Sequence, residues 1–132
     1  NEDRLRIYGL DRLENVELTT ERFSMPKDFN AKEYFSTFFG IVTDENVAVE
    51  RIVIRAYKQH QQYVRSLPIH SSQKELYACD AYADFELRLR PTYDFGMELL
   101  HAGEMIEVIE PKSLRHTMKE WAKSLWELYK QD

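Results

Sequence analysis

Two kinds of hydrophobic periodicity alternate in a fixed order along residues 46–132, and this order limits the fold more than any other feature of the chain. A period of two is typical of strands that bury one face, whereas spacings of three and four are typical of amphipathic helices. The order is strand, helix, strand, strand, helix, strand, helix. The predicted strands cover residues 47–57, 74–79, 82–90 and 105–109, and the predicted helices cover 58–67, 93–102 and the residues from Pro111 onward.

This order predicts an α+β fold with a ferredoxin-like βαββαβ plan and one extra C-terminal helix. In that plan the first and third strands lie side by side in the centre of an antiparallel sheet. Helices cover one face of the sheet and leave the other face open. Residues 46–132 are therefore predicted to form one domain.

The two faces of the central strands carry different residues. Apolar side chains are predicted on the helix-covered face, at Ile52, Ile54, Phe85, Leu87 and Leu89. Four arginines are predicted on the open face, at Arg51, Arg55, Arg88 and Arg90, with Glu86 and Glu107 among them.

Two interpretations of this arginine face remain open. Arginine planes can stack on bases and grip phosphates, so the face could bind a single-stranded nucleic acid. Sheets that bind RNA usually add aromatic side chains on the central strands, and the open positions between Arg51 and Arg55 and between Glu86 and Arg90 hold none. Alternatively, cross-strand Arg–Glu pairs neutralise the face or a neighbouring domain covers it. The mixture of signs favours this second interpretation.

The first 45 residues show weaker patterns. Residues 5–10 and 13–18 are predicted as strands, and two strands alone do not make a stable sheet. They are therefore interpreted as the closing strands, within residues 1–22, of a domain that lies mostly outside this chain. Residues 23–45 are predicted to connect these strands to the sheet domain and to contain one short helix. Asn30 is its predicted N-cap, Glu33 completes a capping box, and Phe29 and Tyr34 are spaced for a contact at its start. The helix is predicted to end at Gly40.

Composition excludes several classes of protein. The formal net charge is −5 with a pI near 5.4, which argues against a chain that coats nucleic acid through bulk charge. The single cysteine allows no intramolecular disulfide, and the N-terminus lacks the apolar core of a secretory signal, so we expect a cytoplasmic chain without a membrane span.

Catalytic and metal-binding patterns are weak. The four histidines show no metal-ligand spacing, and the four isolated glycines form no phosphate loop. We therefore expect no metal site, no cofactor and no enzymatic activity. An enzyme would need convergent groups, for example His70 with Asp80 or Asp84.

Several segments together resemble one known family. The run Leu5-Arg6-Ile7-Tyr8-Gly9-Leu10-Asp11-Arg12-Leu13 resembles the closing motif of WYL domains. Arg22-Phe23, Asp28-Phe29-Asn30, Glu33-Tyr34 and Phe39-Gly40-Ile41 resemble the segment that follows such a domain. Residues 68–73, 89–95 and 108–111 resemble the C-terminal extension of that family, called WCX.

The resemblance implies a bacterial transcription regulator. Such regulators carry an N-terminal winged helix-turn-helix, a WYL domain with an Sm-like (SH3-like) barrel, and a ferredoxin-like WCX domain. The barrel is regarded as a sensor of single-stranded DNA or nucleotide-like effectors, and WCX helps to form the homodimer and to transmit the signal. By position, Arg6, Tyr8 and Arg12 match residues linked to ligand contact, while Gly9 stands where many members carry a second basic residue.

These implications define the expected function and its alternative. We expect a regulatory and dimerisation module that senses or relays binding of a nucleic-acid or nucleotide-like effector. Operator DNA would be bound only through a helix-turn-helix domain, which this chain lacks. The alternative is a stand-alone ferredoxin-like module that binds a small molecule or anion.

Overall fold

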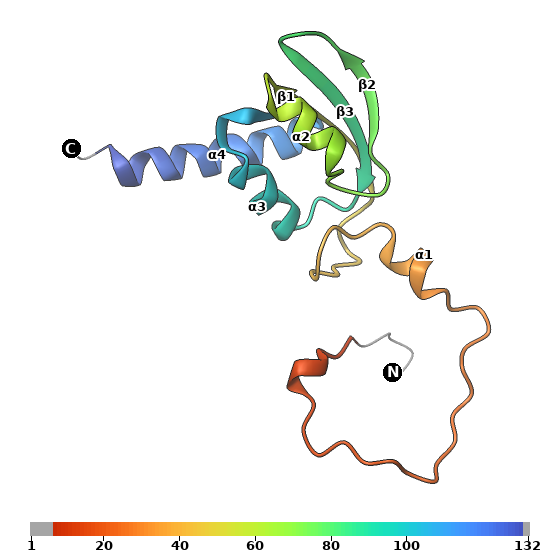
Figure 1. Cartoon of the computed structure of the whole chain (residues 1–132). Coiled ribbons are helices and arrows are strands. Elements are labelled where there is room, and N and C mark those ends of the chain that lie inside the picture. Colours follow the sequence, from red (N-terminus) through yellow and green to blue (C-terminus); the bar gives the residue numbers. More distant parts are fainter. Residues whose placement is uncertain (1–6, 131–132) are drawn as a thin grey trace.

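A computed structural model describes residues 7–130, and its ordered body is a four-stranded antiparallel sheet with helices on one side (Figure 1). The first half of this body contains β1 (Glu50–Tyr57), α2 (His60–Ser66) and β2 (Lys74–Ala78). The second half contains β3 (Tyr82–Leu89), α3 (Tyr93–His101), β4 (Ile106–Glu110) and α4 (Lys112–Tyr129). Each element predicted for residues 46–132 is present, with ends that differ from the prediction by at most three residues.

The strand order is β2-β3-β1-β4, with β1 pairing antiparallel to both β3 and β4. This order confirms the predicted ferredoxin-like arrangement with β1 and β3 in the centre. The register places Ile52 opposite Leu87 and Ile54 opposite Phe85, so the apolar residues of both central strands share one face.

The core lies between that face and the helices. Side chains of α2 and α3 complete it, among them Val64, Phe95 and Leu99, all nearly inaccessible to solvent. The predicted core residues of the sheet are confirmed, because each is at most 1% exposed: Ile52, Ile54, Phe85, Leu87 and Leu89.

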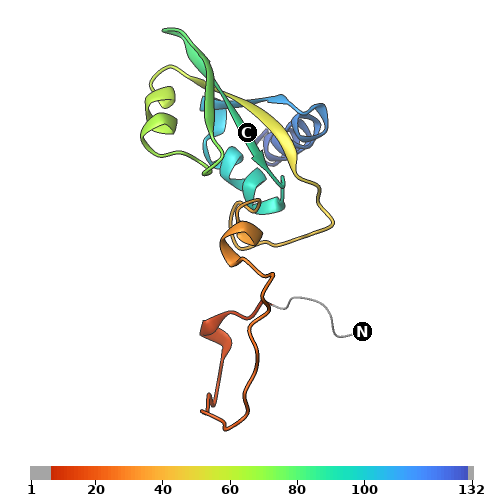
Figure 2. The ribbon, with the colours of Figure 1, turned by 90° about the vertical axis from the view of Figure 1, so that its right-hand side faces the viewer.

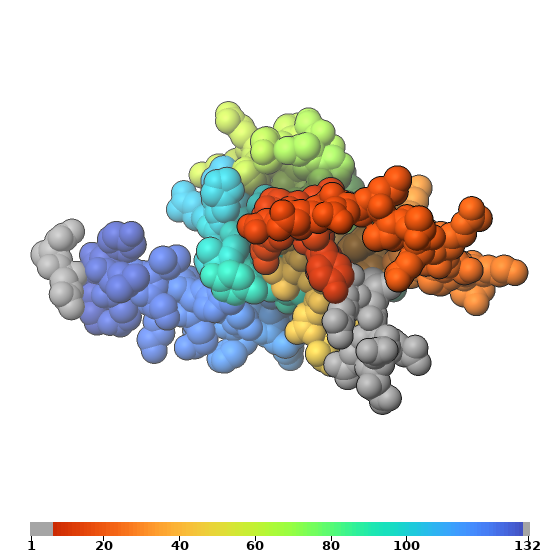
Figure 3. Space-filling model, turned by 90° about the horizontal axis from the view of Figure 1, so that it is seen from below, coloured from red at the N-terminus to blue at the C-terminus, as the bar shows by residue number. Residues whose placement is uncertain are grey.

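Helix α4 begins beside β4 and then runs away from the sheet (Figure 1). The helix packs on the body through buried Leu114 near its start and through Trp121 at its middle, whose ring lies 5.6 Å from that of Tyr93. Gly96 of α3 makes this approach possible, because a Cβ there would lie 2.5 Å from the Trp121 ring. The second half of α4 projects beyond the body, as the blue end of the chain shows in Figure 3.

The two strands predicted over residues 5–10 and 13–18 do not form in the described residues 7–18, and that prediction was wrong there. The segment holds only a 3-10 turn at Leu10–Arg12, and it extends as an open loop away from the sheet (Figure 2). A strand needs a neighbour to satisfy its backbone hydrogen bonds, and residues 7–49 contain no strand that could serve. Residues 5 and 6 lie outside the described residues.

The short helix α1 (Ala31–Phe35) begins as predicted and ends early. The amide of Glu33 donates to the Asn30 side chain at 3.3 Å, and the rings of Phe29 and Tyr34 lie 5.7 Å apart. The helix ends at Phe35 rather than at Gly40, because the following residues turn toward the core. There Phe38 is buried and the ring of Phe39 lies 5.5 Å from that of Phe95.

Candidate functional site

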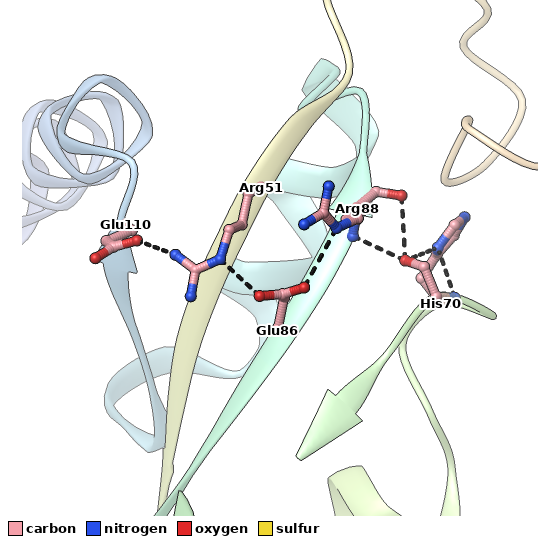
Figure 4. A network of polar contacts seen from close by, with 6 residues as sticks. Arg51, His70, Glu86, Arg88 and Glu110 are labelled. Atoms are coloured by element: carbon pink, nitrogen blue, oxygen red, sulfur yellow. Dashed lines mark hydrogen bonds and ion pairs between the residues drawn. The ribbon is translucent and has the colours of Figure 1, made fainter. Parts of the chain in front are cut away.

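The open face of the sheet carries a row of alternating charges that crosses three strands (Figure 4). Arg51 Nε donates to Glu86 Oε2 at 2.6 Å, and Arg51 Nη1 pairs with Glu110 of β4. Arg88 Nε donates to the other Glu86 oxygen at 3.3 Å. We call these four residues the charge ladder: Glu110, Arg51, Glu86 and Arg88. The ladder confirms the interpretation in which cross-strand pairs neutralise much of this face.

The ladder alters the protonation of its central members. The hydrogen bond from Arg51 lowers the pKa of Glu86 below its ordinary value, and the Glu86 carboxylate raises the pKa of Arg51 in turn. Both side chains are therefore held in their charged forms. Arg88 is more open, with 65% of its side chain exposed against 43% for Arg51.

Ser72, just before the edge strand β2, binds the backbone of Arg88 near the end of β3. The Arg88 amide donates to Ser72 Oγ at 2.8 Å, and Ser72 Oγ donates to the Arg88 carbonyl at 3.1 Å. His70 Nδ1 lies 2.8 Å from the same oxygen, and burial lowers the pKa of its imidazole (Figure 4). His70 is thus engaged with Ser72, and the structure does not bring it together with Asp80 or Asp84 as a catalytic pair.

Arg55 occupies the other half of the open face and is held on two sides. Its Nε and Nη2 donate to the two Asp84 oxygens at 2.7 and 2.9 Å, which is a bidentate pair. The guanidinium also lies 3.8 Å from the centre of the Tyr82 ring, a cation–π contact. The hydrogen bond to Asp84 raises the pKa of Arg55 further above its ordinary value.

Three tyrosines surround this end of the face. The ring centres of Tyr57 and Tyr82 lie 6.4 Å apart, and those of Tyr77 and Tyr82 lie 5.7 Å apart. We call these residues the tyrosine cluster: Tyr57, Tyr77 and Tyr82. Tyr77 is 54% exposed, so its ring is accessible from solvent.

Sequence reasoning missed the tyrosine cluster, although the signal was present. Tyr57 follows Arg55 by two residues and Tyr82 precedes Asp84 by two, so the same period extended to the strand ends places both on the open face. The open face therefore does carry aromatic side chains, at its end rather than at its centre.

Arg90 has different surroundings from the other three arginines. It follows the end of β3, and its guanidinium donates to Thr37 Oγ1 at 3.3 Å, to the Glu45 carbonyl at 3.2 Å and to the Val47 carbonyl. Strand β3 ends at Leu89 because Pro91 follows closely. The open face consequently offers Arg51, Arg55 and Arg88, and Arg90 binds the segment that precedes β1.

The site residues predicted from the WYL-like motif are Arg6, Tyr8 and Arg12. Among the described residues, neither Tyr8 nor Arg12 forms a hydrogen bond or an ion pair with a residue of the open face. Arg6 lies outside the described residues. Tyr8 is 66% exposed, and Arg12 is exposed and forms an ion pair with Asp11 at 3.9 Å. Their role in ligand contact stays a prediction.

Within residues 7–130, no three His, Cys, Asp or Glu side chains are grouped closely enough to hold a metal ion. None of the helices in that range combines the length and the apolar character that a membrane span requires. The open face of the sheet can bind a ligand through stacking on its aromatic rings and through its charged groups, or it can dock against a neighbouring domain.

Comparison with known proteins connects this geometry to one family. The profile of the WCX domain matches residues 48–126, from just before β1 to the last quarter of α4. No curated protein matches the chain. A WCX domain is consistent with a regulatory module of WYL-type regulators and is not a known catalytic type. Because the match covers more than half of the chain, this protein belongs to the WCX domain family.

Proposed function

We propose that this chain is the regulatory and dimerisation part of a bacterial, cytoplasmic WYL-type transcriptional regulator. Its sheet domain takes part in recognising a single-stranded nucleic acid or nucleotide-like effector. The WCX match and the WYL-like motif at residues 5–13 support the context. The observation that carries the proposal is that the same open sheet face presents an exposed aromatic ring, Tyr77, and an exposed arginine, Arg88.

The chemistry of the two groups fits such an effector. Bases stack on accessible aromatic rings, and an exposed guanidinium binds phosphate oxygens. Arg51 is already paired with Glu86 and Glu110, so affinity for an effector depends on few groups of this face. Arg88 lies six positions after Tyr82 in β3, so the distance between them along the strand is about 20 Å. A short oligonucleotide reaches both ends of the face, whereas a mononucleotide reaches one.

The WYL-like residues complete the mechanism. The effector is held by Arg6, Tyr8 and Arg12 on the barrel side, and the open face of the same or a partner subunit closes over it. Closing changes the relative orientation of the subunits and so repositions the DNA-binding domains. Operator DNA is contacted by the helix-turn-helix domain of such a regulator.

The projecting half of α4 supports the homodimer. Four large apolar or aromatic side chains there are between 45% and 78% exposed: Leu125, Trp126, Leu128 and Tyr129. A patch of this kind on one helix is typical of a protein interface, and a two-fold pair of such helices would cover it.

Fluorescence anisotropy tests the effector proposal directly. Fluorescein-labelled oligothymidylate of eight nucleotides is titrated with the chain at 50 and 200 mM salt. We expect binding that weakens with salt, and about a tenfold loss in Tyr77→Ala, since stacking on one ring contributes about 1–3 kcal/mol. Arg88→Ala should weaken binding and reduce the dependence on salt.

Lys123→Ala, on α4 and away from the open face, is the matched control and should bind as the unmodified chain does. No binding by the unmodified chain, or equal binding by all four proteins, would contradict the proposal. Reversing the charge of Arg88 in the complete regulator should likewise weaken the transcriptional response to effector.

A further inference from the structure

A separate cavity of about 630 Å³ lies between the end of α3, β4 and the first three turns of α4. Its volume falls in the range of small-molecule sites. None of the arginines of the open face lines it, and Tyr57 alone is shared with the tyrosine cluster. What it would bind is independent of the proposal for the open face.

The inner wall of the cavity is apolar. Leu99 and Val108, which belong to the buried core, are part of this wall. Gly103 turns the chain with a φ of +58°, and a Cβ there would meet no atom within 4 Å, so this turn keeps one side open. The remaining apolar lining comes from Leu100, Ile106, Met118 and Ala122.

The rim is basic on the side of α4. Lys112, Arg115, His116 and Lys119 follow one another at helical spacing, so one face of the helix presents them to the cavity. Three cationic side chains, Lys112, Arg115 and Lys119, line the cavity beside two carboxylates, Glu104 and Glu107. Glu107 pairs with Arg115, and among the described residues neither Lys112 nor Lys119 forms an ion pair. The rim therefore has an excess of positive charge.

Arg115 is the group that gives the rim a fixed geometry. Its Nη1 donates to Glu107 Oε1 at 2.5 Å and to the Val108 carbonyl at 2.6 Å. Glu107 is itself held by the Tyr57 hydroxyl at 2.5 Å, and these bonds lower the pKa of its carboxyl group. No described residue accepts a bond from Arg115 Nε or Nη2. A guanidinium fixed by one nitrogen and free at the other two is preorganised for a carboxylate.

We infer that this cavity binds an amphipathic organic anion, with its carboxylate on Arg115 between Lys112 and Lys119 and its apolar body against Leu100 and Met118. An unpaired charge inside an apolar pocket would be costly, so the anionic group stays at the basic rim while the apolar body enters. A neutral molecule of the same shape gains only the apolar part. The charged head and the apolar body together define the ligand class.

Decanoate is the probe, and decanol and decyltrimethylammonium are its neutral and cationic matches. Isothermal titration at submillimolar concentrations, with thermal unfolding in parallel, measures binding to the chain. We expect decanoate to raise the unfolding temperature and to bind at least fivefold more tightly than decanol, with no binding of the cation. Equal affinity for all three probes, or no binding of decanoate, would overturn the inference.

Three variants locate the site. Arg115→Gln should reduce decanoate affinity toward that of decanol, and Lys119→Ala should reduce it less. Ala122→Trp fills the cavity from an exposed helix position and should abolish binding of both decanoate and decanol. Lys123→Ala, one residue outside the lining, is the matched control and should leave affinity unchanged.

If circular dichroism shows that Arg115→Gln is unfolded, Lys119→Ala and Ala122→Trp decide the question. Unchanged decanoate affinity in both of them would overturn the inference. Tyr77→Ala separates the two proposals, because it should lose oligonucleotide binding and keep decanoate binding. Failure of one proposal therefore leaves the other standing.

Discussion

Two short segments of this chain have nearly the same hydrophobic pattern, but one forms a buried strand and the other is exposed. Val16-Glu17-Leu18 and Phe85-Glu86-Leu87 both place apolar residues on either side of a glutamate. Leu87 is fully buried in β3, whereas Leu18 is fully exposed at 103% and belongs to no strand. Phe85 and Leu87 have β1 beside them and helices above them. A periodic pattern decides which way a side chain would point, and a partner decides whether the element forms.

The segment between these two regions shows an intermediate case. Residues 37–47 form no strand or helix, yet they are bound to the sheet domain by side chains that lie about fifty residues later. Besides the bonds to Arg90, the amide of Val42 donates to Asp94 at 3.2 Å. Irregular backbone is thus fixed here by polar side chains.

The largest effect should come from removing a ring in the buried region. Phe85→Ala leaves a cavity in the middle of the core, and we expect it to lower the free energy of unfolding by about 3–5 kcal/mol. Phe23→Ala removes the same ring where it is 83% exposed and should change it by less than about 0.5 kcal/mol. Urea denaturation followed by circular dichroism measures both. Comparable losses would mean that residues 7–28 pack on a partner.

A smaller effect is expected where the intermediate segment is bound. Arg90→Met keeps the apolar stem and removes the donors to the Glu45 and Val47 carbonyls, which should cost about 2 kcal/mol. Hydrogen exchange of the Val42 amide should become faster, because the segment detaches. Arg12→Met, at an exposed arginine of the first region, serves as the control. Unchanged exchange in Arg90→Met would show that Asp94 suffices to hold the segment.

The pH dependence of stability should be carried in part by Glu107. Its bonds from Tyr57 and Arg115 lower its pKa in the folded state below the ordinary 4.5. Its contribution to stability is therefore complete above pH 4.5 and is lost as the pH falls through the lowered pKa.

Glu107→Gln should be less stable than the unmodified chain at pH 7, and the difference should shrink as the pH is lowered below 4.5. Thermal unfolding between pH 3 and 7 measures this difference. Glu14→Gln removes the same charge from an exposed position in the first region and should follow the unmodified profile. A difference for Glu107→Gln that is constant over this range would contradict the assignment.

The smallest effect concerns α1. Asn30→Ala removes the side-chain acceptor of the Glu33 amide and should weaken this helix by at most about 1 kcal/mol. Because α1 has no buried residue of its own, the unfolding midpoint of the sheet domain should stay the same. Faster exchange of the Glu33 amide, with Asn30→Asp restoring protection, is the expected signature. A shifted midpoint would show that α1 and the sheet unfold together.

Sequence reasoning predicted the sheet domain because each of its signals is local. The alternation around Ile54 and Phe85 and the helical spacing around Trp121 specify faces without knowledge of distant residues. The hydrogen bonds of Arg90 could not be predicted from local patterns, since its partners lie 43–53 residues earlier in the chain. The same holds for Arg115, which is one more surface arginine in the sequence and becomes a fixed group only through Glu107 and Val108.

The bonds made by Arg90 and Asp94 would also limit how freely any domain attached upstream could move. With Thr37 and Val42 tied to the junction of β3 and α3, the free tether upstream of the sheet domain stops at α1 instead of reaching β1. A shorter tether confines whatever is attached to it to a smaller volume and so raises its effective concentration at the sheet domain. One guanidinium and one carboxylate would thus restrict the volume that an attached domain explores before it meets this surface.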